Sequence, residues 1–263
     1  MKEKTAPKSF TKNPIQGTKF AIAISSAKGG VGKSTFAINL ALALKNLGSK
    51  VGILDADIYG PSIPKMMNIN QKPESDGNNF TPIEKYGVQC ISIGFLIDEE
   101  TPIIWRGPMV TNAIRTFTQK VLWNNLDFLI IDMPPGTGDT QLTFAQEINI
   151  DGAVIISTPQ EIALLDVKRG IKMFDKFKVK IIGLVDNMSH FEGDDGKKYN
   201  IFGEGGVERV AKEFNKNFLG KIPINPDIGK TADNGKPLVE ENPEHKISKV
   251  YLELAKKIKS SFL

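Results

Sequence analysis

The stretch that decides the fold is residues 25–35, which read Ser-Ser-Ala-Lys-Gly-Gly-Val-Gly-Lys-Ser-Thr. An apolar run over 20–25 leads into this stretch, and a helical pattern over 33–47 begins near its end. The stretch therefore joins a predicted strand to a predicted helix. Its three glycines let consecutive backbone N–H groups curve around a phosphate, and the helix start adds the positive end of its dipole. The segment therefore predicts a phosphate-binding loop, although Ala27 stands where the general pattern has its first glycine.

Each residue of this loop has an expected part in nucleotide binding. Lys33 is placed to contact the β and γ phosphates, and the Ser34 hydroxyl is placed to ligate Mg²⁺. Thr35 can hydrogen-bond an α-phosphate oxygen or simply cap the helix. We therefore expect ATP and Mg²⁺ as cofactors, and a nucleotide-binding set made of Ala27, Lys28, Gly29, Gly30, Val31, Gly32, Lys33, Ser34 and Thr35.

Three aspartates follow predicted strands. Asp55 and Asp57 come after the apolar run 51–54, and Asp132 closes the run 128–131. Ligands of open parallel sheets bind at the carboxyl ends of the strands, so these carboxylates are expected to converge on the phosphate loop. Asp132 is the candidate for holding an Mg²⁺-bound water, and Asp55 is expected to support the metal directly or through water. A single aspartate after a strand is usually a turn former, so the spacing relative to the loop is what favours a site.

Short apolar runs alternate with helical patterns along the chain. Uniformly apolar strands suit the middle of a parallel sheet buried on both faces, and alternation with helices implies right-handed crossovers. The sequence therefore predicts an α/β fold with a doubly wound, mostly parallel sheet. The predicted strands cover 20–25, 51–54, 88–93, 128–131, 153–156 and 179–185, and the predicted helices cover 33–47, 109–123, 141–147 and 162–177.

The remaining segments carry no strong pattern. Residues 64–85 and 189–206 are polar, without an apolar period, and are expected to be loops or insertions. The Lys-rich stretch 1–18 contains prolines and no apolar run, so a flexible leader is expected there. One P-loop ATPase domain over 19–263 is then the simplest organisation.

Composition bounds the partners and the compartment. The net charge of +4 is too slight to argue for nucleic acid or a membrane surface. Cys90 is the only cysteine in the sequence and lies in the apolar run 88–93, so a disulfide within the chain is impossible and no role is assigned to Cys90. No apolar stretch is long enough for a spanning helix. We expect a soluble, cytoplasmic protein with no nucleic-acid partner and no stable membrane insertion.

Lys28 is a second lysine that an ordinary phosphate loop does not require. With it, the loop resembles that of the deviant Walker A P-loop NTPases, which include MinD, ParA and the nitrogenase iron protein. The resemblance implies an ATPase that works as a homodimer, in which Lys28 reaches the partner's phosphates as an arginine finger does elsewhere. It also implies that Asp57 orients the attacking water and that Asn187 hydrogen-bonds the adenine edge. The catalytic residues that it implies are Lys28, Lys33 and Asp57.

Residues 133–139, Met-Pro-Pro-Gly-Thr-Gly-Asp, are a candidate switch segment. Its glycines permit a backbone that changes shape with the γ-phosphate, and its prolines limit where the backbone bends. A rigid surface turn is the alternative interpretation. No arginine finger can be identified within the phosphate loop, so slow intrinsic hydrolysis is expected.

Five longer blocks narrow the resemblance. They are Asp-Ala-Asp-Ile-Tyr-Gly-Pro-Ser at 55–62, Trp-Arg-Gly-Pro-Met at 105–109, Asp-Met-Pro-Pro-Gly-Thr-Gly-Asp at 132–139, Asn-Met-Ser at 187–189 and Ile-Phe-Gly-Glu-Gly-Gly at 201–206. Together they resemble the Mrp/ApbC group of iron-sulfur cluster carrier proteins, over almost the whole chain from about Gly17. The resemblance implies a homodimer that binds ATP and hands iron-sulfur clusters to apoprotein clients or works with cluster-assembly proteins.

One departure from that group concerns the cargo. Many members carry a Cys-x-x-Cys pair between the last two blocks, whereas this chain has Phe-Glu-Gly-Asp-Asp-Gly-Lys-Lys-Tyr at 191–199. Some members lack the pair too, so membership is compatible with its absence. Asp194 and Asp195 are hard oxygen ligands that suit a cluster poorly, and a solvated turn is expected there.

The rival class is a positioning ATPase of the MinD or ParA kind, which acts on a membrane or DNA surface. Its support is the segment 247–262, where apolar residues fall on one helical face among lysines. The same pattern is typical of a last helix docked on the sheet, which is the interpretation we favour. An oxidoreductase of Rossmann type is not supported, because the first strand is not followed by Gly-x-Gly-x-x-Gly.

Overall fold

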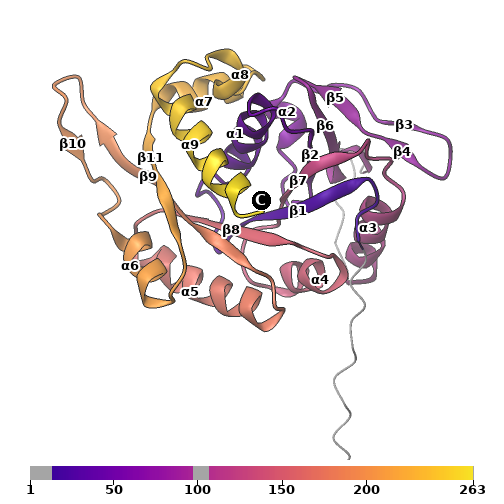
Figure 1. Cartoon of the computed structure of the whole chain (residues 1–263), viewed down its shortest axis with the longest axis horizontal. Coiled ribbons are helices and arrows are strands. Elements are labelled where there is room, and N and C mark those ends of the chain that lie inside the picture. The colour runs from indigo at the N-terminus through magenta and orange to yellow at the C-terminus, as the bar shows by residue number, and fades with distance from the viewer. Residues whose placement is uncertain (1–13, 97–106, 263) are drawn as a thin grey trace, which may run out of the picture.

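The computed structural model describes residues 14–96 and 107–262. Within them, a nine-stranded sheet forms the centre of the molecule, in the order β10-β9-β8-β1-β7-β2-β6-β5, with β11 also paired to β9 (Figure 1). Neighbouring strands are parallel except in the β5/β6 and β9/β10 pairs. The strands of this sheet are β1 (Thr18–Ser26), β2 (Val51–Asp55), β5 (Ile83–Lys85), β6 (Val88–Ser92), β7 (Leu126–Asp132), β8 (Gly152–Ser157), β9 (Ile181–Glu192), β10 (Lys198–Tyr199) and β11 (Phe218–Ile224).

Helices cover both faces of the sheet (Figure 1). Side chains alternate along a strand, so Ile22 and Ile24 of β1 pack on one face while Ala21 and Ala23 pack on the other. The mostly parallel, doubly wound sheet predicted from the sequence is thereby confirmed. The first face carries α1 (Lys33–Asn46), α2 (Ile63–Met66), α7 (Pro226–Asp233), α8 (Leu238–Glu241) and α9 (Lys246–Ser260), and the second carries α3 (Gly107–Gln119), α4 (Asp139–Glu147), α5 (Glu161–Lys176) and α6 (Gly206–Glu213).

Residues 64–85 and 189–206, which are expected to be loops or insertions, contain short strands, so the loop alternative is wrong for those parts. The first segment contains β3 (Glu74–Ser75), β4 (Phe80–Thr81) and β5, and a 3₁₀ turn, η1 (Ile93–Leu96), follows β6. In the second segment β9 continues to Glu192, because β11 pairs with it as far as Phe191, and β10 then folds back on it. Two- and three-residue strands at a sheet edge are too short to show an apolar period, which is why the pattern missed them.

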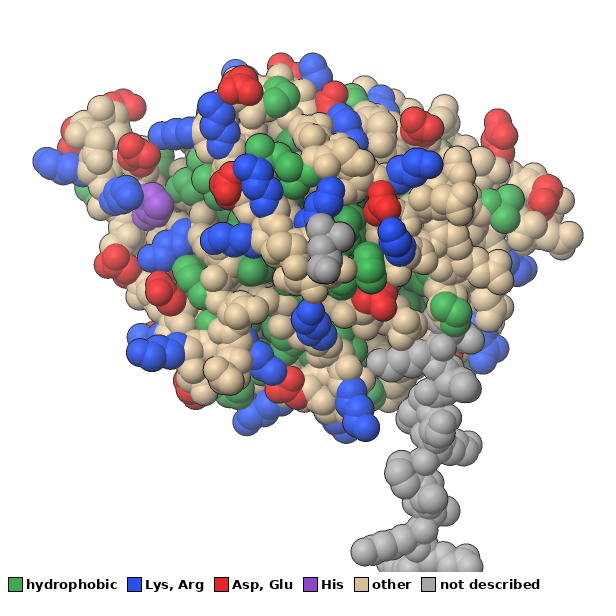
Figure 2. All heavy atoms as spheres, in the orientation of Figure 1, with side chains coloured by type: hydrophobic (Ala, Val, Ile, Leu, Met, Phe, Trp, Pro, Cys, Tyr) green, Lys and Arg blue, Asp and Glu red, His purple; other side chains and the backbone are tan. Residues whose placement is uncertain are grey.

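The C-terminal helix α9 docks on the domain. Its apolar face is buried against α1 and the sheet, and the rings of Phe36 and Tyr251 lie 5.9 Å apart between centroids. Its lysines have partners within the protein: Lys257 Nζ donates to the Leu219 carbonyl and Lys259 Nζ to the Leu47 carbonyl. Figure 2 shows basic side chains scattered among acidic and uncharged ones on the face that carries α9. The docked-helix interpretation is confirmed.

The start of the described chain is also packed. Ile15 is 4% exposed and belongs to the core cluster on the second face, and Thr18 already begins β1. The flexible leader expected over 1–18 falls mainly on residues 1–13, which lie outside the described residues. Among the helices of 14–96 and 107–262, none has the length and apolar character to span a bilayer.

Candidate nucleotide-binding site

The phosphate loop connects β1 to α1 at the carboxyl edge of the sheet. Gly30 and Gly32 have φ angles of +78° and +83°, a left-handed conformation that favours glycine. A Cβ built on Gly29 or Gly30 would meet no atom within 4 Å, so this part of the loop backbone faces open space. Ala27 is half-buried and Val31 is buried, while Lys28 is exposed.

Lys33 is the cation at the centre of the site. Its side chain is only 6% exposed, and Nζ lies 2.7 Å from Asp132 Oδ1 and 3.4 Å from Asp57 Oδ2. Nζ also lies 3.4 Å from Ser34 Oγ. The structure thus brings together four of the residues that the sequence predicts for the site.

Ser34 and Asp132 form an oxygen pair beside that lysine. Ser34 Oγ donates to Asp132 Oδ2 over 2.6 Å, and Asp132 is fully buried. Burial raises the pKa of Asp132, and the neighbouring Lys33 ammonium opposes the shift. A hydroxyl and a carboxylate are oxygen ligands of the kind that Mg²⁺ prefers, so the chemistry of these two side chains suits the magnesium ion that the sequence predicts.

The structure excludes one of the two roles suggested for Thr35. Helix α1 begins at Lys33 with Gly32 as its N-cap residue, and no side chain caps it. Thr35 therefore does not cap the helix. Its half-buried side chain stays a candidate for an α-phosphate oxygen.

Asp55 and Asp57 play different structural parts. Asp55 is fully buried, and its carboxylate accepts hydrogen bonds from the backbone N–H groups of Asp57 and Ile63 and from Ser92 Oγ, at 3.3, 3.2 and 3.0 Å. Burial, with a contribution from Asp132, raises the pKa of Asp55 to about 7. Asp55 thus holds the loop that follows β2, while Asp57 points its carboxylate at Lys33.

The candidate switch segment lies against the end of β1. Met133 N donates to the Ile24 carbonyl and Gly136 N to the Ser26 carbonyl, at 3.1 and 2.9 Å. Tyr59 Oη, after β2, lies 3.0 Å from Thr140 Oγ1 at the start of α4, so a side-chain hydrogen bond joins the two loops. Sequence reasoning did not find Tyr59 and Thr140, because neither residue type carries a signal of its own.

Asn187 touches the loop from the end of β9. Its Nδ2 donates to the Val31 carbonyl over 2.7 Å, and a Cβ built on Gly32 would lie 2.4 Å from that nitrogen. Asn187 is therefore packed against the phosphate loop, and its expected hydrogen bond to the adenine edge stays a prediction. The contact that the structure gives it is with loop backbone.

Neither Cys90 nor the 191–199 segment offers an accessible thiolate for an iron-sulfur cluster. Cys90 is 1% exposed inside the first-face core, where burial raises the pKa of its thiol. Asp194 and Asp195 lie exposed in the turn between β9 and β10, and Asp195 Oδ1 accepts a hydrogen bond from Lys197 N. The solvated turn expected there is what the structure has. Across 14–96 and 107–262, no group of three or more His, Cys, Asp or Glu side chains is placed to hold a metal ion.

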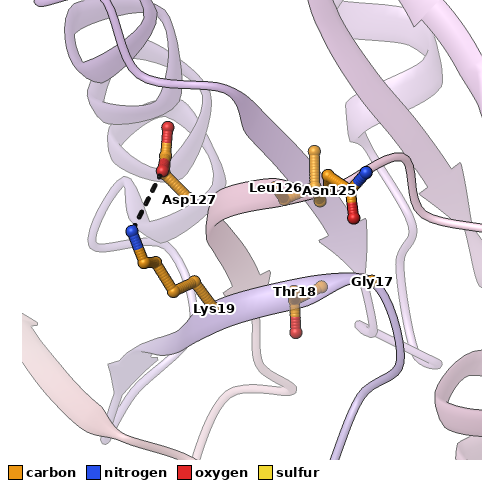
Figure 3. Close-up of a pocket in the computed structure, with 6 residues that line it drawn as sticks. All are labelled: Gly17, Thr18, Lys19, Asn125, Leu126 and Asp127. Atoms are coloured by element: carbon orange, nitrogen blue, oxygen red, sulfur yellow. Dashed lines mark ion pairs between the residues drawn. The ribbon is translucent and has the colours of Figure 1, made fainter.

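A pocket of about 460 Å³ at the opposite edge of the sheet is separate from this site. It lies where β1 and β7 begin, and Figure 3 shows the Lys19–Asp127 ion pair, 3.8 Å long, on one side of it. Since the phosphate loop follows the far end of β1, this pocket takes no part in nucleotide binding.

Comparison with known proteins identifies the family. The family model for the ParA-type NUBPL iron-transfer P-loop NTPases matches residues 17–259. The chain belongs to this family. Among NUBPL-family relatives, the iron-sulfur cluster carrier protein of Aquifex aeolicus is 45% identical, over 94% of this chain and 69% of its own length. The iron-sulfur cluster transfer protein NUBPL of Dictyostelium discoideum is 48% identical, over 94% of this chain and 78% of its own length.

The fold of this chain is similar to those of solved nucleotide-binding proteins. A nucleotide-binding protein from Archaeoglobus fulgidus, in complex with ADP, superposes with a TM-score of 0.78 at 37% identity, covering 90% of this chain and 93% of that one. The cell division ATPase MinD of Pyrococcus furiosus superposes with a TM-score of 0.69 at 21% identity, covering 92% and 99%. The MinD likeness shows the fold alone. The chain is thus a P-loop NTPase of the iron-transfer family.

Proposed function

We propose that this chain is an ATP-driven factor of iron-sulfur cluster delivery, which works as a homodimer on apoprotein clients or with cluster-assembly proteins. The observation that carries the proposal is the convergence of Lys33, Ser34, Asp57 and Asp132 in a chain 45% identical to an iron-sulfur cluster carrier protein. A cytoplasmic location is part of the proposal.

The nucleotide step uses groups already in contact. The loop backbone holds the phosphates, and Lys33 exchanges its carboxylate partners for phosphate oxygens. Asn187, which donates to the Val31 carbonyl without nucleotide, hydrogen-bonds the adenine edge in this proposal. Ser34 and Asp132, with Asp55 directly or through water, would hold Mg²⁺, which would neutralise phosphate charge when bound. Asp57, freed from Lys33, orients the attacking water, and exposed Lys28 is available to the partner's phosphates. Intrinsic turnover is slow because the loop contains no arginine finger.

The cargo step needs thiolates from outside the chain. A four-thiolate cluster site cannot be built from a homodimer that contributes two copies of buried Cys90. The residues of this chain therefore do not fit a cluster by themselves. Clients, assembly proteins or a small thiol such as glutathione supply the ligands, and the nucleotide state of this protein controls when they meet.

The positioning-ATPase alternative has less support. Its membrane argument needed the apolar face of the C-terminal helix, and that face is buried in the core. Vesicles of anionic lipid provide the check, since ATP-dependent sedimentation with them is the behaviour that this class predicts and that we do not expect.

ATP turnover tests the nucleotide half of the proposal. Phosphate release by the wild-type protein should require Mg²⁺, and Asp57→Asn should lower kcat by roughly 10²-fold while ATP still binds. Asp175 is an exposed carboxylate on α5, so Asp175→Asn is the matched control and should hydrolyse ATP at the normal rate. Unchanged turnover in Asp57→Asn would remove its assigned role.

Anaerobic reconstitution tests the cargo half. The purified chain, supplied with iron, sulfide and a reductant, should retain little cluster by iron and sulfide analysis and by visible absorbance, with Cys90→Ser behaving alike. When an apoprotein with free cysteines is included in the mixture, a cluster should form on that apoprotein in a way that depends on ATP and on this chain. A stable, stoichiometric cluster on the chain alone would contradict the thiolate argument, and ATP-independent transfer would contradict the switch.

A further inference from the structure

Gln141 is a buried polar side chain that the nucleotide chemistry above does not use. It lies in the first turn of α4, directly after the candidate switch segment, and is 1% exposed. Its Nε2 donates to the Pro134 carbonyl over 2.6 Å and to Ser25 Oγ over 3.2 Å. One side chain thus joins three parts of the protein: the switch segment, the start of α4 and the end of strand β1 before the phosphate loop.

The two acceptors give these contacts their meaning. Pro134 lies two residues after Asp132, and its carbonyl is tied to a residue seven positions further on, so the intervening segment is closed into a fixed turn. Ser25 lies in the strand that leads into the phosphate loop. The Gln141 amide therefore connects the segment that would sense the γ-phosphate to the strand that leads into the phosphate loop.

Packing alone does not account for an amide at this position. Gln141 Oε1 is buried and, among the described residues, has no hydrogen-bond partner. An unpaired buried oxygen is unfavourable, so an apolar side chain of similar size would fill the space at a lower cost in stability. The two donated hydrogen bonds are what an amide supplies and an apolar side chain does not.

Neighbouring contacts point the same way. Gly136 N donates to the Ser26 carbonyl, so backbone and side-chain hydrogen bonds hold one segment to one strand end. Thr140, next to Gln141, meets Tyr59 from the loop after β2. The first turn of α4 is thus in contact with both loops that flank Lys33.

We propose that Gln141 is a positioning residue for ATP turnover, which fixes the 133–138 segment against β1 and so keeps Asp132 and that segment in register with the phosphate loop. The inference rests on the proposed ATPase function. Gln141 touches no reacting atom in this arrangement, and it acts through Pro134 and Ser25.

Kinetics with two variants tests the proposal. Gln141→Met keeps the length of the side chain and removes both donors, and Gln141→Glu keeps the shape and leaves at most one donor, the O–H of a protonated carboxyl. Each should lower kcat for ATP by about tenfold while KM changes by less than about threefold, because the phosphate-binding residues stay in place. Ser25→Ala, which removes one acceptor, should have a smaller effect of the same kind.

Hydrogen–deuterium exchange supplies a readout that does not need turnover. Without nucleotide, peptides covering 133–141 should exchange faster in Gln141→Met than in the wild type, while peptides from α9 should not change. Ser248→Ala is the matched control, since Ser248 is also buried, at 2% exposed, and donates to backbone carbonyls far from the site. It should change neither kcat nor exchange at 133–141.

The outcomes separate the two proposals. Wild-type kcat and wild-type exchange at 133–141 in both Gln141 variants would overturn the positioning role, as would an equal loss of kcat in Ser248→Ala. If the wild-type protein hydrolyses no ATP, the ATPase proposal and the kinetic role of Gln141 both fail. In that case, faster exchange confined to 133–141 would still identify Gln141 as the group that fixes the segment.

Discussion

The ammonium group of Lys33 lies 2.7 Å from Asp132 Oδ1, and both side chains are almost completely enclosed. Asp57 shares the same cation from 3.4 Å. In the proposed function Lys33 contacts phosphate oxygens, so it must leave both carboxylates when nucleotide binds. Nucleotide binding and the release of the two aspartates from Lys33 are then one event. In the proposed nucleotide step, the phosphate loop and both flanking loops therefore respond together.

Lys33→Ala should abolish ATP binding and also destabilise the protein. It leaves Asp132 and Asp57 buried without their cation, which costs roughly 3 kcal/mol in unfolding free energy. Adding Asp132→Asn should recover much of that stability without restoring ATP binding. Calorimetric titration measures the binding and denaturant unfolding measures the stability. Equal ATP affinity in wild-type and Lys33→Ala proteins would mean that the site is elsewhere.

Lys28 should act across a dimer. With a non-hydrolysable ATP analogue and Mg²⁺, light scattering should give twice the monomer mass. Lys28→Ala should still bind ATP as a monomer but should lose turnover, since exposed Lys28 makes its contribution to the partner's phosphates. Lys212→Ala on α6, another exposed lysine, is the control. A monomer under saturating analogue would argue against this arrangement.

Two glycines of the phosphate loop should respond differently to alanine. Both have left-handed φ angles, but a Cβ meets open space at Gly30 and would lie 2.4 Å from Asn187 Nδ2 at Gly32. Gly30→Ala should cost about 1 kcal/mol of stability from backbone strain, and Gly32→Ala roughly 2–3 kcal/mol because Asn187 must also move. Thermal unfolding measures both. In the Gly32→Ala background, Asn187→Ala should be less harmful than in the wild type, and strict additivity would rule out the steric conflict.

Asp186 should make stability depend on pH. It is 1% exposed on β9, at the end of the pairing with β8. Burial raises the pKa of Asp186 to about 6, with Lys221 opposing and Glu208 adding to the shift. The native state then keeps a proton that the unfolded chain has already lost, so this group lowers stability as pH rises from about 4 to about 6.

Asp186→Asn removes that titration. The variant should be more stable than the wild type by roughly 1–3 kcal/mol at pH 7.5, and the gain should vanish at pH 4. Thermal unfolding across this range measures it, with exposed Asp195→Asn as the control. A stability gain that is the same at both pH values would mean that another effect of the substitution is responsible.

The sequence by itself determined the phosphate loop and the class of fold. Both follow from local rules: glycines that permit positive φ sit at fixed spacing before a helix, and apolar strands alternate with amphipathic helices. The same local patterns predict that Lys33, Ser34 and the aspartates lie near one another, because the carboxyl ends of parallel strands share an edge of the sheet.

Only the tertiary structure decided which of these groups touch. Lys33 and Asp132 are 99 residues apart, and Asn187 and Val31 are 156 apart, so no local pattern could pair them. The structure likewise turned Asp55 toward its own loop, extended β9 beyond its apolar core and gave Gln141 its two acceptors. The physical reason is that hydrogen bonds and ion pairs are satisfied by whatever the folded chain brings within about 3 Å, and that depends on the packing of the whole sheet.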